Sequence, residues 1–136
     1  MQETDTGSAP ATADQIQRSL ARGHTIDITT TGRHSGQPRR IEIVFHNIDG
    51  RIIITGSPRA DRRRSWLFNL EADPNLTFHL KGAVHADLPA TAREITDPAE
   101  RQAIAEWVAT HAWRNQDPAT MAAYSPMIEV TFPDLG

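Results

Sequence analysis

Two strand-like segments joined by an Asp-Gly turn constrain the fold of this chain more than any other part of the sequence. Residues 40–46 alternate between apolar and polar side chains, which is the pattern of a half-buried β-strand. Residues 51–56 are richer in isoleucine and indicate a more buried strand. The pair Asp49-Gly50 between them is a strong signal for a tight β-hairpin. Because strands joined in this way run antiparallel, we expect an antiparallel sheet.

Other segments have the composition of strands or the periodicity of helices. The further predicted strands are residues 24–31, 75–81, 83–95 and 126–132. The predicted helices are residues 12–23, 62–73 and 97–113. Six antiparallel strands with helices inserted between them indicate an α+β, mostly β fold, built as a small six-stranded barrel or split barrel.

Capping signals mark the starts of two predicted helices. Asp97 is followed by Pro98 and, three residues after the cap, by Glu100, which is the order of an N-cap, a first-turn proline and a capping acid. Asp61 is the predicted N-cap of the helix over residues 62–73. The inward stripe of the helix over 97–113 is predicted to contain Ile104, Trp107, Val108 and His111.

Composition limits the class of protein. The 136 residues include no cysteine, which excludes disulfides, thiol catalysis and thiolate metal sites. We assign residues 12–136 to one domain and interpret the small, polar residues 1–11 as a disordered N-terminal segment. The sequence has neither an apolar run of the about 20 residues that a membrane span needs nor a visible secretory signal. We therefore expect a cytoplasmic protein.

Positive charge is concentrated between residues 32 and 69. This stretch carries a charge of +5 (8 basic and 3 acidic residues), whereas the rest of the chain carries −8 (6 basic and 14 acidic residues). A dense basic region in an acidic protein indicates a site for an anion. The net charge of −3 argues against a general nucleic-acid binder, so no nucleic-acid partner is expected.

These basic residues lie on two predicted loops. The first, residues 32–40, combines the charges of Arg33 and Arg39 with a serine hydroxyl and two glycines, which let backbone N–H groups approach an anion. The second, residues 57–64, places arginines at a predicted helix start, where they do not favour the helix dipole. The alternative interpretation of each loop is a solvated turn or a solubilising surface run.

Three further residues are candidates for the site. Trp66 and Asn69 lie three apart and share one helix face. Trp66 alone is interpreted as a core residue, while Asn69 is expected to bond neighbouring backbone or to face a ligand. Residues 115–121 are predicted to be a loop or a short turn of helix. Tyr124, on an irregular segment, is either a packing residue, which we favour, or a proton donor. The histidines have no metal-binding spacing, so no metal is expected.

Taken together, these motifs resemble one family. The segment TTTGRHSGQPRR, the Asp-Gly hairpin, the GSPR loop and the segment SWLFNLEADPNLTFHLKG resemble the flavin/deazaflavin oxidoreductase superfamily. The greater similarity is to its deazaflavin-dependent nitroreductase-like branch, which is typical of actinobacteria. The resemblance runs from Thr29 to Lys81. It implies a split β-barrel of the FMN-binding type.

The resemblance also implies a cofactor and its contacts. The implied cofactor is coenzyme F420, a deazaflavin, with FMN as the less favoured alternative. Its phosphate and polyglutamate tail would contact His34, Ser35, Gly36, Gln37 and Arg39. The residues implied at the ring or in the same groove are Thr55, Gly56, Ser57, Arg59, Arg64, Trp66 and Asn69. The implied catalytic residues are Tyr124 and Ser57.

The function that the resemblance implies is hydride transfer from the reduced deazaflavin to a quinone-, nitro- or enone-type acceptor. The alternative is a non-enzymatic carrier of a fatty acid or another lipid on the same barrel. Split barrels often dimerise, and an exposed strand edge would invite pairing, so a homodimer is among the expected assemblies. Contact with a membrane surface is a further alternative to a purely cytoplasmic protein.

Overall fold

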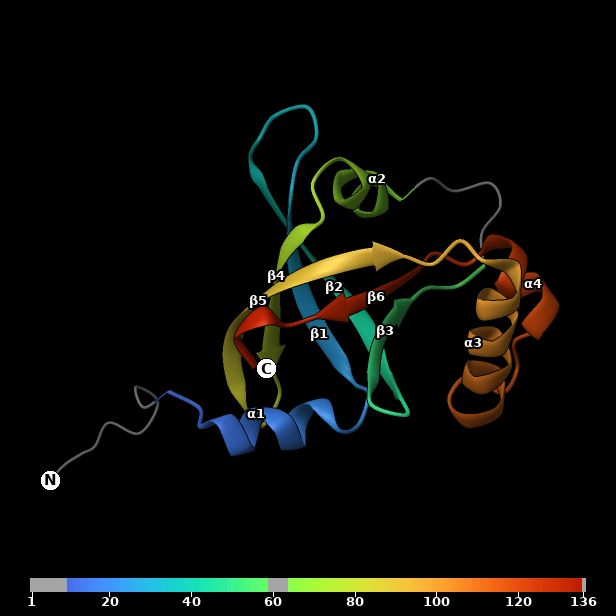
Figure 1. The fold of residues 1–136 in the computed structure, drawn as a ribbon, viewed down its shortest axis with the longest axis horizontal. Coiled ribbons are helices and arrows are strands. Elements are labelled where there is room, and N and C mark those ends of the chain that lie inside the picture. Colours follow the sequence, from blue (N-terminus) through green and yellow to red (C-terminus); the bar gives the residue numbers. More distant parts are fainter. Residues whose placement is uncertain (1–9, 59–63, 136) are drawn as a thin grey trace, which may run out of the picture.

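The computed structural model describes residues 10–58 and 64–135, and these form a closed antiparallel barrel with helices packed around it (Figure 1). The strands are β1 (Thr25–Thr31), β2 (Pro38–Ile48), β3 (Arg51–Thr55), β4 (Asn75–Lys81), β5 (His85–Glu94) and β6 (Met127–Thr131). The helices are α1 (Ala13–Leu20), α2 (Ser65–Ala72), α3 (Pro98–His111) and α4 (Pro118–Tyr124), followed by a terminal 3-10 helix η2 (Pro133–Leu135).

The strand order around the barrel is β1-β2-β3-β6-β5-β4, and every neighbouring pair is antiparallel. The last strand, β6, closes the barrel by pairing with β3 on one side and β5 on the other. The predicted six-stranded, mostly β architecture with inserted helices is therefore confirmed. The β2–β3 turn has positive φ at Asp49 (53°) and Gly50 (88°), which is the tight hairpin geometry that the Asp-Gly pair predicted.

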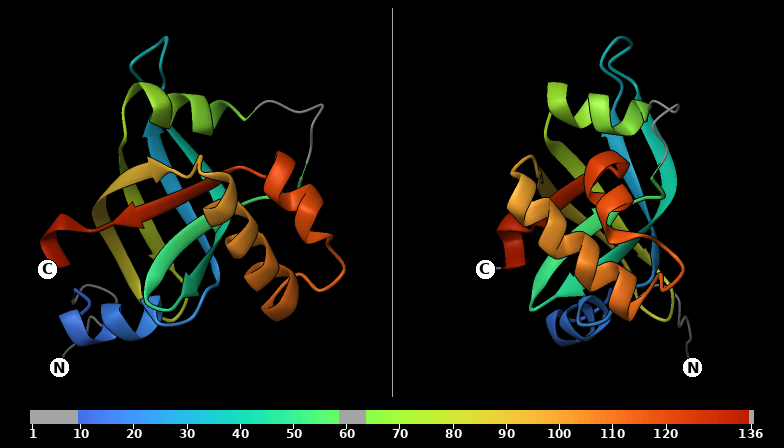
Figure 2. Two further views of the ribbon diagram at one scale, coloured as in Figure 1. Left: turned by 45° about the vertical axis from the view of Figure 1, so that its right-hand side comes forward. Right: turned by 90° about the vertical axis from the view of Figure 1, so that its right-hand side faces the viewer.

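The barrel has an inner core and a second core outside it. Inside, alternating strand residues are fully buried, and the rings of Phe45 and Phe78 meet edge to face with centroids 5.4 Å apart. Outside, α3 and α4 cover one wall of the barrel (Figure 2). The residues of this second core are Ile48, Ile53, Ile95, Ile104, Ala105, Val108, Met121 and Met127. The second cluster thus fixes α3 and α4 to the barrel and is separate from the core inside it.

The β1–β2 hairpin projects beyond the barrel, beside α2 (Figures 1 and 2). Its tip turns at Gly36, where φ is +71°, a backbone conformation that glycine adopts without strain. The Gly36 N–H donates to the carbonyl of Gly32 at 2.8 Å, and the Gly32 N–H donates to that of Gln37 at 2.8 Å. These bonds give the basic hairpin a defined shape at its tip.

The structure corrects three expectations about the helices. Pro118–Tyr124 is a helix, capped by Asp117, so Tyr124 ends a regular element and does not lie on an irregular segment. Asp117 and Pro118 repeat the Asp-Pro signal that correctly marked the start of α3, but the prediction for residues 115–121 did not use this signal. His111 is exposed and is not part of the inward stripe of α3. Helix α2 is observed to begin at Ser65, and the predicted cap Asp61 lies outside the described residues.

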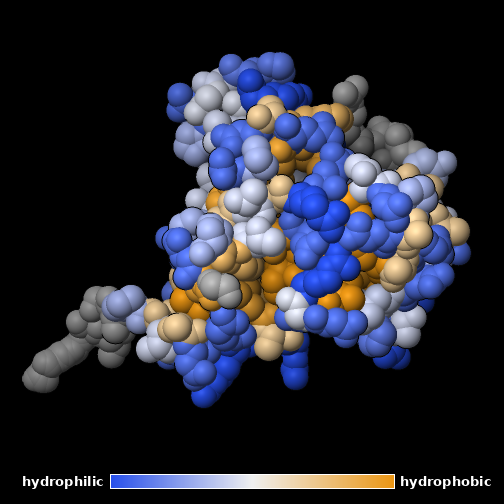
Figure 3. Space-filling view, in the orientation of Figure 1, coloured by the Kyte–Doolittle hydropathy of each residue, from blue (hydrophilic) through white to orange (hydrophobic). Residues whose placement is uncertain are grey.

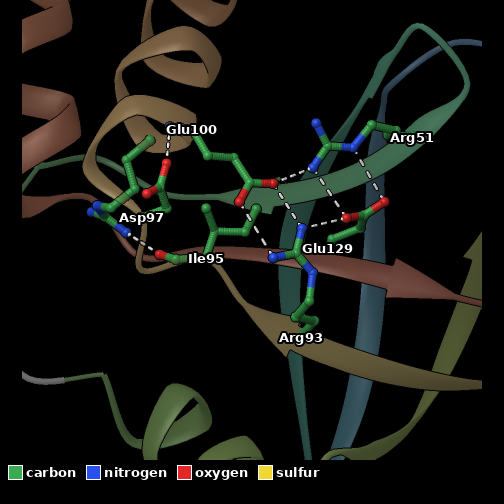
Figure 4. Close-up of polar contacts among 7 residues, drawn as sticks. Arg51, Arg93, Ile95, Asp97, Glu100 and Glu129 are labelled. Atoms are coloured by element: carbon green, nitrogen blue, oxygen red, sulfur yellow. Dashed lines mark hydrogen bonds and ion pairs between the residues drawn. The ribbon is translucent and has the colours of Figure 1, made fainter.

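Four alternating charges join α3 to three strands (Figure 4). Arg51 of β3 contacts Glu129 of β6 through two hydrogen bonds of 3.1 and 3.2 Å, and contacts Glu100 of α3 at 2.6 Å. Arg93 of β5 contacts the same two carboxylates, each at 2.7 Å. Hydrogen bonds from the two guanidinium groups lower the pKa of both Glu100 and Glu129. The network sets the position of α3 and the segment before it.

Replacing Glu129 with glutamine will lower the free energy of unfolding by about 1 kcal/mol, because two arginines lose their shared carboxylate. The effect is modest because the four side chains remain between a fifth and a little over half exposed. Urea unfolding at neutral pH measures it. Glu106→Gln, on the exposed side of α3, is the control and should change stability by less than half as much. Equal losses in the two variants would contradict a structural role for the network.

The surface of the barrel is divided between polar and apolar areas. Hydrophilic surface runs across the face seen in Figure 3, and hydrophobic surface borders it on both sides. Within residues 10–58 and 64–135, no helix is long and apolar enough to cross a membrane.

Candidate functional site

Two cavities lie against opposite faces of α2. The first, which we call the hairpin pocket, has a volume of about 350 Å³ and lies between the β1–β2 hairpin and the α2 face that carries Trp66 and Asn69. The second, which we call the α4 pocket, has a volume of about 480 Å³ and is lined by Leu67 and Phe68 of α2 and by the end of α4. Helix α2 is therefore the common wall of both cavities.

Asn69 ties α2 to the basic hairpin. Its amide nitrogen donates to Thr30 Oγ1 at 3.1 Å, and its Oδ1 accepts from the Arg33 backbone N–H at 3.0 Å and from Arg33 Nη1 at 3.3 Å. Both Asn69 and Thr30 are buried. Arg33 also lies over the Phe68 ring, with its guanidinium carbon 5.3 Å from the ring centre. The expectation that Asn69 bonds neighbouring backbone is confirmed by the bond from the Arg33 N–H.

The hairpin pocket brings several predicted site residues together. His34, Ser35, Arg39, Trp66 and Asn69 all line it, with Arg33 and Arg40 as further cations. Ser35 organises the tip, since its Oγ accepts from the Gln37 N–H at 3.1 Å and from Arg39 Nη2 at 3.4 Å. Trp66 is 8% exposed and packs in the barrel core, which confirms the core interpretation, while its edge reaches the pocket.

The end of β3 and its loop lie near the start of α2 and the start of β6. Thr55 is buried and donates from Oγ1 to the Pro126 carbonyl at 2.7 Å. Arg64 donates from Nη2 to the Ser57 carbonyl at 2.6 Å and passes so close to Gly56 that a side chain there would collide with it. A side chain at position 56 would therefore displace the end of the flexible Arg64 side chain. Arg59, another predicted contact, lies outside the described residues.

The α4 pocket contains residues that the sequence did not single out. Tyr124, 55% exposed, lines it beside Ser125, and this exposure contradicts the packing interpretation of the tyrosine. Arg64 also lines this pocket, and Glu94 and Arg101 reach it from the end of β5 and from α3. No sequence signal marked these last two, because each is one charged residue within a regular element.

Burial and neighbouring charges alter the acids and bases of the α4 pocket. Burial raises the pKa of Glu94, and a hydrogen bond to the Glu71 carboxyl group with like-charge repulsion raises it further. Burial lowers the pKa of Arg101, which nevertheless remains cationic. Two of the predicted site residues, Arg64 and Tyr124, thus lie at this second cavity, across α2 from the hairpin pocket.

A split barrel with a basic hairpin against a helix is the arrangement expected from the resemblance to the flavin- and deazaflavin-dependent oxidoreductases. The sequence matches the model of the F420H(2)-dependent quinone reductase family over residues 5–124, and the chain belongs to this family. It is accordingly a deazaflavin-dependent reductase that uses coenzyme F420.

Solved structures agree with this fold. An F420-H2-dependent reductase (FDR-A) is 24% identical, with a TM-score of 0.57 over 79% of this chain and 93% of that chain. A conserved hypothetical protein from Mycobacterium tuberculosis is 17% identical, with a TM-score of 0.68 over 96% of this chain and 86% of that chain. A protein described as a domain-swapped dimer is 23% identical, with a TM-score of 0.59 over 79% of each chain.

Proposed function

We propose that the protein reduces a quinone-type acceptor with coenzyme F420, and that nitro and enone compounds are the alternative acceptors. The observation that carries the proposal is the hairpin pocket, in which Arg33, Arg39 and Arg40 line one cavity together with Ser65, Trp66 and Asn69 of α2. A cofactor with an anionic tail and a planar ring needs cationic groups for the tail and an aromatic side chain beside the ring. The match to a quinone reductase family over residues 5–124 supports the acceptor class.

The residues present fit such a cofactor. We assign its phosphate and acidic tail to His34, Ser35, Gly36, Gln37 and Arg39, because His34, Ser35 and Arg39 line the hairpin pocket and Gly36 and Gln37 adjoin them at the tip. We assign the borders of the ring to Thr55, Gly56, Ser57, Arg64, Trp66 and Asn69. When bound, the cofactor supplies the hydride, and the protein binds it, orients it and keeps water from the acceptor. Tyr124 and Ser57 remain the proposed catalytic residues.

Positioning is the main task of the chain's own side chains. Asn69 holds the hairpin against α2, and Arg33 covers Phe68 on the opposite edge of that helix. Arg64 holds the loop after β3 through the Ser57 carbonyl. These contacts fix the distance between the cationic hairpin and the end of β3, so a ligand that spans the two meets a preformed surface.

Replacing Arg39 with alanine will weaken binding of coenzyme F420 about tenfold. This is the lower end of the contribution of a charge-assisted hydrogen bond, and we expect the lower end because Arg39 is exposed to solvent. Fluorescence titration of the deazaflavin measures the dissociation constant. Arg18→Ala, which removes an exposed arginine from α1, is the matched control and should leave the affinity unchanged. An unaltered affinity in Arg39→Ala would remove this residue from the tail site.

A further inference from the structure

Ser125, at the junction of α4 and β6, has a buried hydroxyl group without a partner. The residue is 2% exposed, and its Oγ forms no hydrogen bond within the described structure. It lines the α4 pocket, beside Tyr124 and Pro126. Leaving a hydroxyl unpaired in the interior costs about 1–3 kcal/mol, so such groups usually have a partner. A ligand in the pocket is one source of that partner.

Arg101 presents a second set of donors at the same cavity. Its Nε, Nη1 and Nη2 donate to the carbonyls of Ala122, Ile95 and Ser125, at 2.8, 2.9 and 2.5 Å. Three of the five guanidinium N–H groups are used in this way, which leaves two. Among the described residues, no carboxylate forms an ion pair with Arg101. The positive charge is therefore compensated only by carbonyl dipoles and by Glu94 at longer range.

Glu94 lies where two cavities meet. It lines the α4 pocket and also a neighbouring cavity of about 280 Å³ that contains Glu71. Glu71 is exposed on the last turn of α2, and burial together with the neighbouring Glu71 carboxyl group raises the pKa of Glu94. The raised pKa keeps the neutral form of Glu94 to higher pH, and the O–H group of that form can donate a hydrogen bond to a ligand in the pocket.

We propose that the α4 pocket is the subsite for the oxygen-bearing end of the hydride acceptor, held by Ser125, Arg101 and Glu94. The inference rests on the proposed function and adds the residues that hold the acceptor. All three groups donate hydrogen bonds, which suits a carbonyl or nitro oxygen that gains negative charge on reduction. Leu67, Phe68 and Pro126 supply the apolar walls for the rest of a flat molecule.

The pocket also makes acceptor binding depend on pH. Only the protonated Glu94 carboxyl group donates, so affinity falls as pH rises through its pKa, which lies above the usual range for glutamate. The charged and titratable groups that face it are Glu71 on α2, Arg64 before α2, Arg101 on α3 and Tyr124 on α4. Burial and Glu71 favour the neutral carboxyl group, and Arg101 favours the ionised one.

The test measures binding of menadione, a small quinone, by calorimetry to protein saturated with oxidised coenzyme F420, so that no turnover occurs. Ser125→Ala will lower menadione affinity about threefold to tenfold, the range for one neutral hydrogen bond. Its melting temperature will be unchanged or higher, because the hydroxyl has no partner to lose. A merely structural serine would not combine weaker binding with retained stability.

Ser19→Ala is the matched control, since Ser19 lies on α1, remote from the pocket, and its hydroxyl contacts His24; menadione affinity should not change. In Glu94→Gln the pH dependence of affinity, measured from about pH 5 to about pH 8, should disappear. Unchanged affinity in Ser125→Ala, or absence of menadione binding to the wild type, overturns the subsite. Failure of the deazaflavin itself to bind would instead refute the proposed function, and the calorimetry would then be run on the free protein.

Discussion

Replacing Asn69 with alanine will lower the free energy of unfolding by about 2–4 kcal/mol and will also weaken coenzyme binding. The substitution removes the partner of the buried Thr30 hydroxyl and of the Arg33 backbone N–H. A buried polar group left without a partner costs about 1–3 kcal/mol, and here two groups lose theirs. The second effect follows because these bonds hold the basic hairpin against α2.

Two comparisons separate these effects. Asn69→Asp keeps an acceptor for Arg33 and leaves Thr30 Oγ1 an oxygen to which it can donate, so its loss of stability should be about half that of alanine. Asn75→Ala removes an exposed asparagine at the start of β4 and should change stability by no more than about 0.5 kcal/mol. Urea unfolding and deazaflavin titration are both required. Normal coenzyme affinity in a destabilised Asn69→Ala would show that the hairpin keeps its position without this residue.

The sequence predicted the barrel because its signals are local and agree with one another. Strand alternation, the Asp49-Gly50 turn and the capping order at Asp97 each depend on residues close in the chain. The order of an N-cap aspartate followed by a first-turn proline recurs at Asp117 and Pro118, and a helix begins there as well. The sequence predicted a loop or a short turn of helix over residues 115–121, because the seven residues of α4 are too few for a long apolar stripe and only the cap marks their start.

The sequence predicted the hairpin pocket far better than the α4 pocket. The hairpin residues are neighbours in the chain, and their glycines and arginines stand out from the surrounding composition. The α4 pocket is made by Glu94, Arg101 and Ser125, which belong to β5, α3 and the segment after α4. Their proximity depends on the packing of α3 on the barrel. Exposed His111 shows the same limit, since periodicity alone does not say where the covered face of a helix ends.

The burial of His46 was equally invisible in the sequence. The alternation over residues 40–46 puts this residue on the polar, outward face of β2, but α3 and the turn after it cover that face. Its ring meets those of Trp107 and Trp113 edge to face, with centroids 6.3 and 5.1 Å apart. The side chain is 4% exposed, and its Nε2 has no hydrogen-bond partner within the described structure. Protonation would therefore place a charge in an apolar interior.

Burial lowers the pKa of His46 to about 4, from 6.5 in the unfolded chain. Between these values the unfolded state binds more protons, so stability is full above about pH 6.5 and falls as pH falls towards 4. The linkage relation gives a loss of about 2 kcal/mol at pH 5 and about 3 kcal/mol at pH 4 from this one residue. The carboxylates of Glu100 and Glu129, whose pKa values are lowered, add their own loss at still lower pH.

Replacing His46 with leucine removes the titrating group and the unpaired nitrogen together. We expect the variant to be as stable as the wild type at pH 8 and about 2 kcal/mol more stable at pH 5, as measured by urea unfolding across this range. His85→Leu, at an exposed position of β5, is the matched control and should follow the acid profile of the wild type. Parallel acid profiles for His46→Leu and the wild type would mean that water reaches His46 in the folded protein. The contact between α3 and the barrel would then be looser than its packed tryptophans indicate.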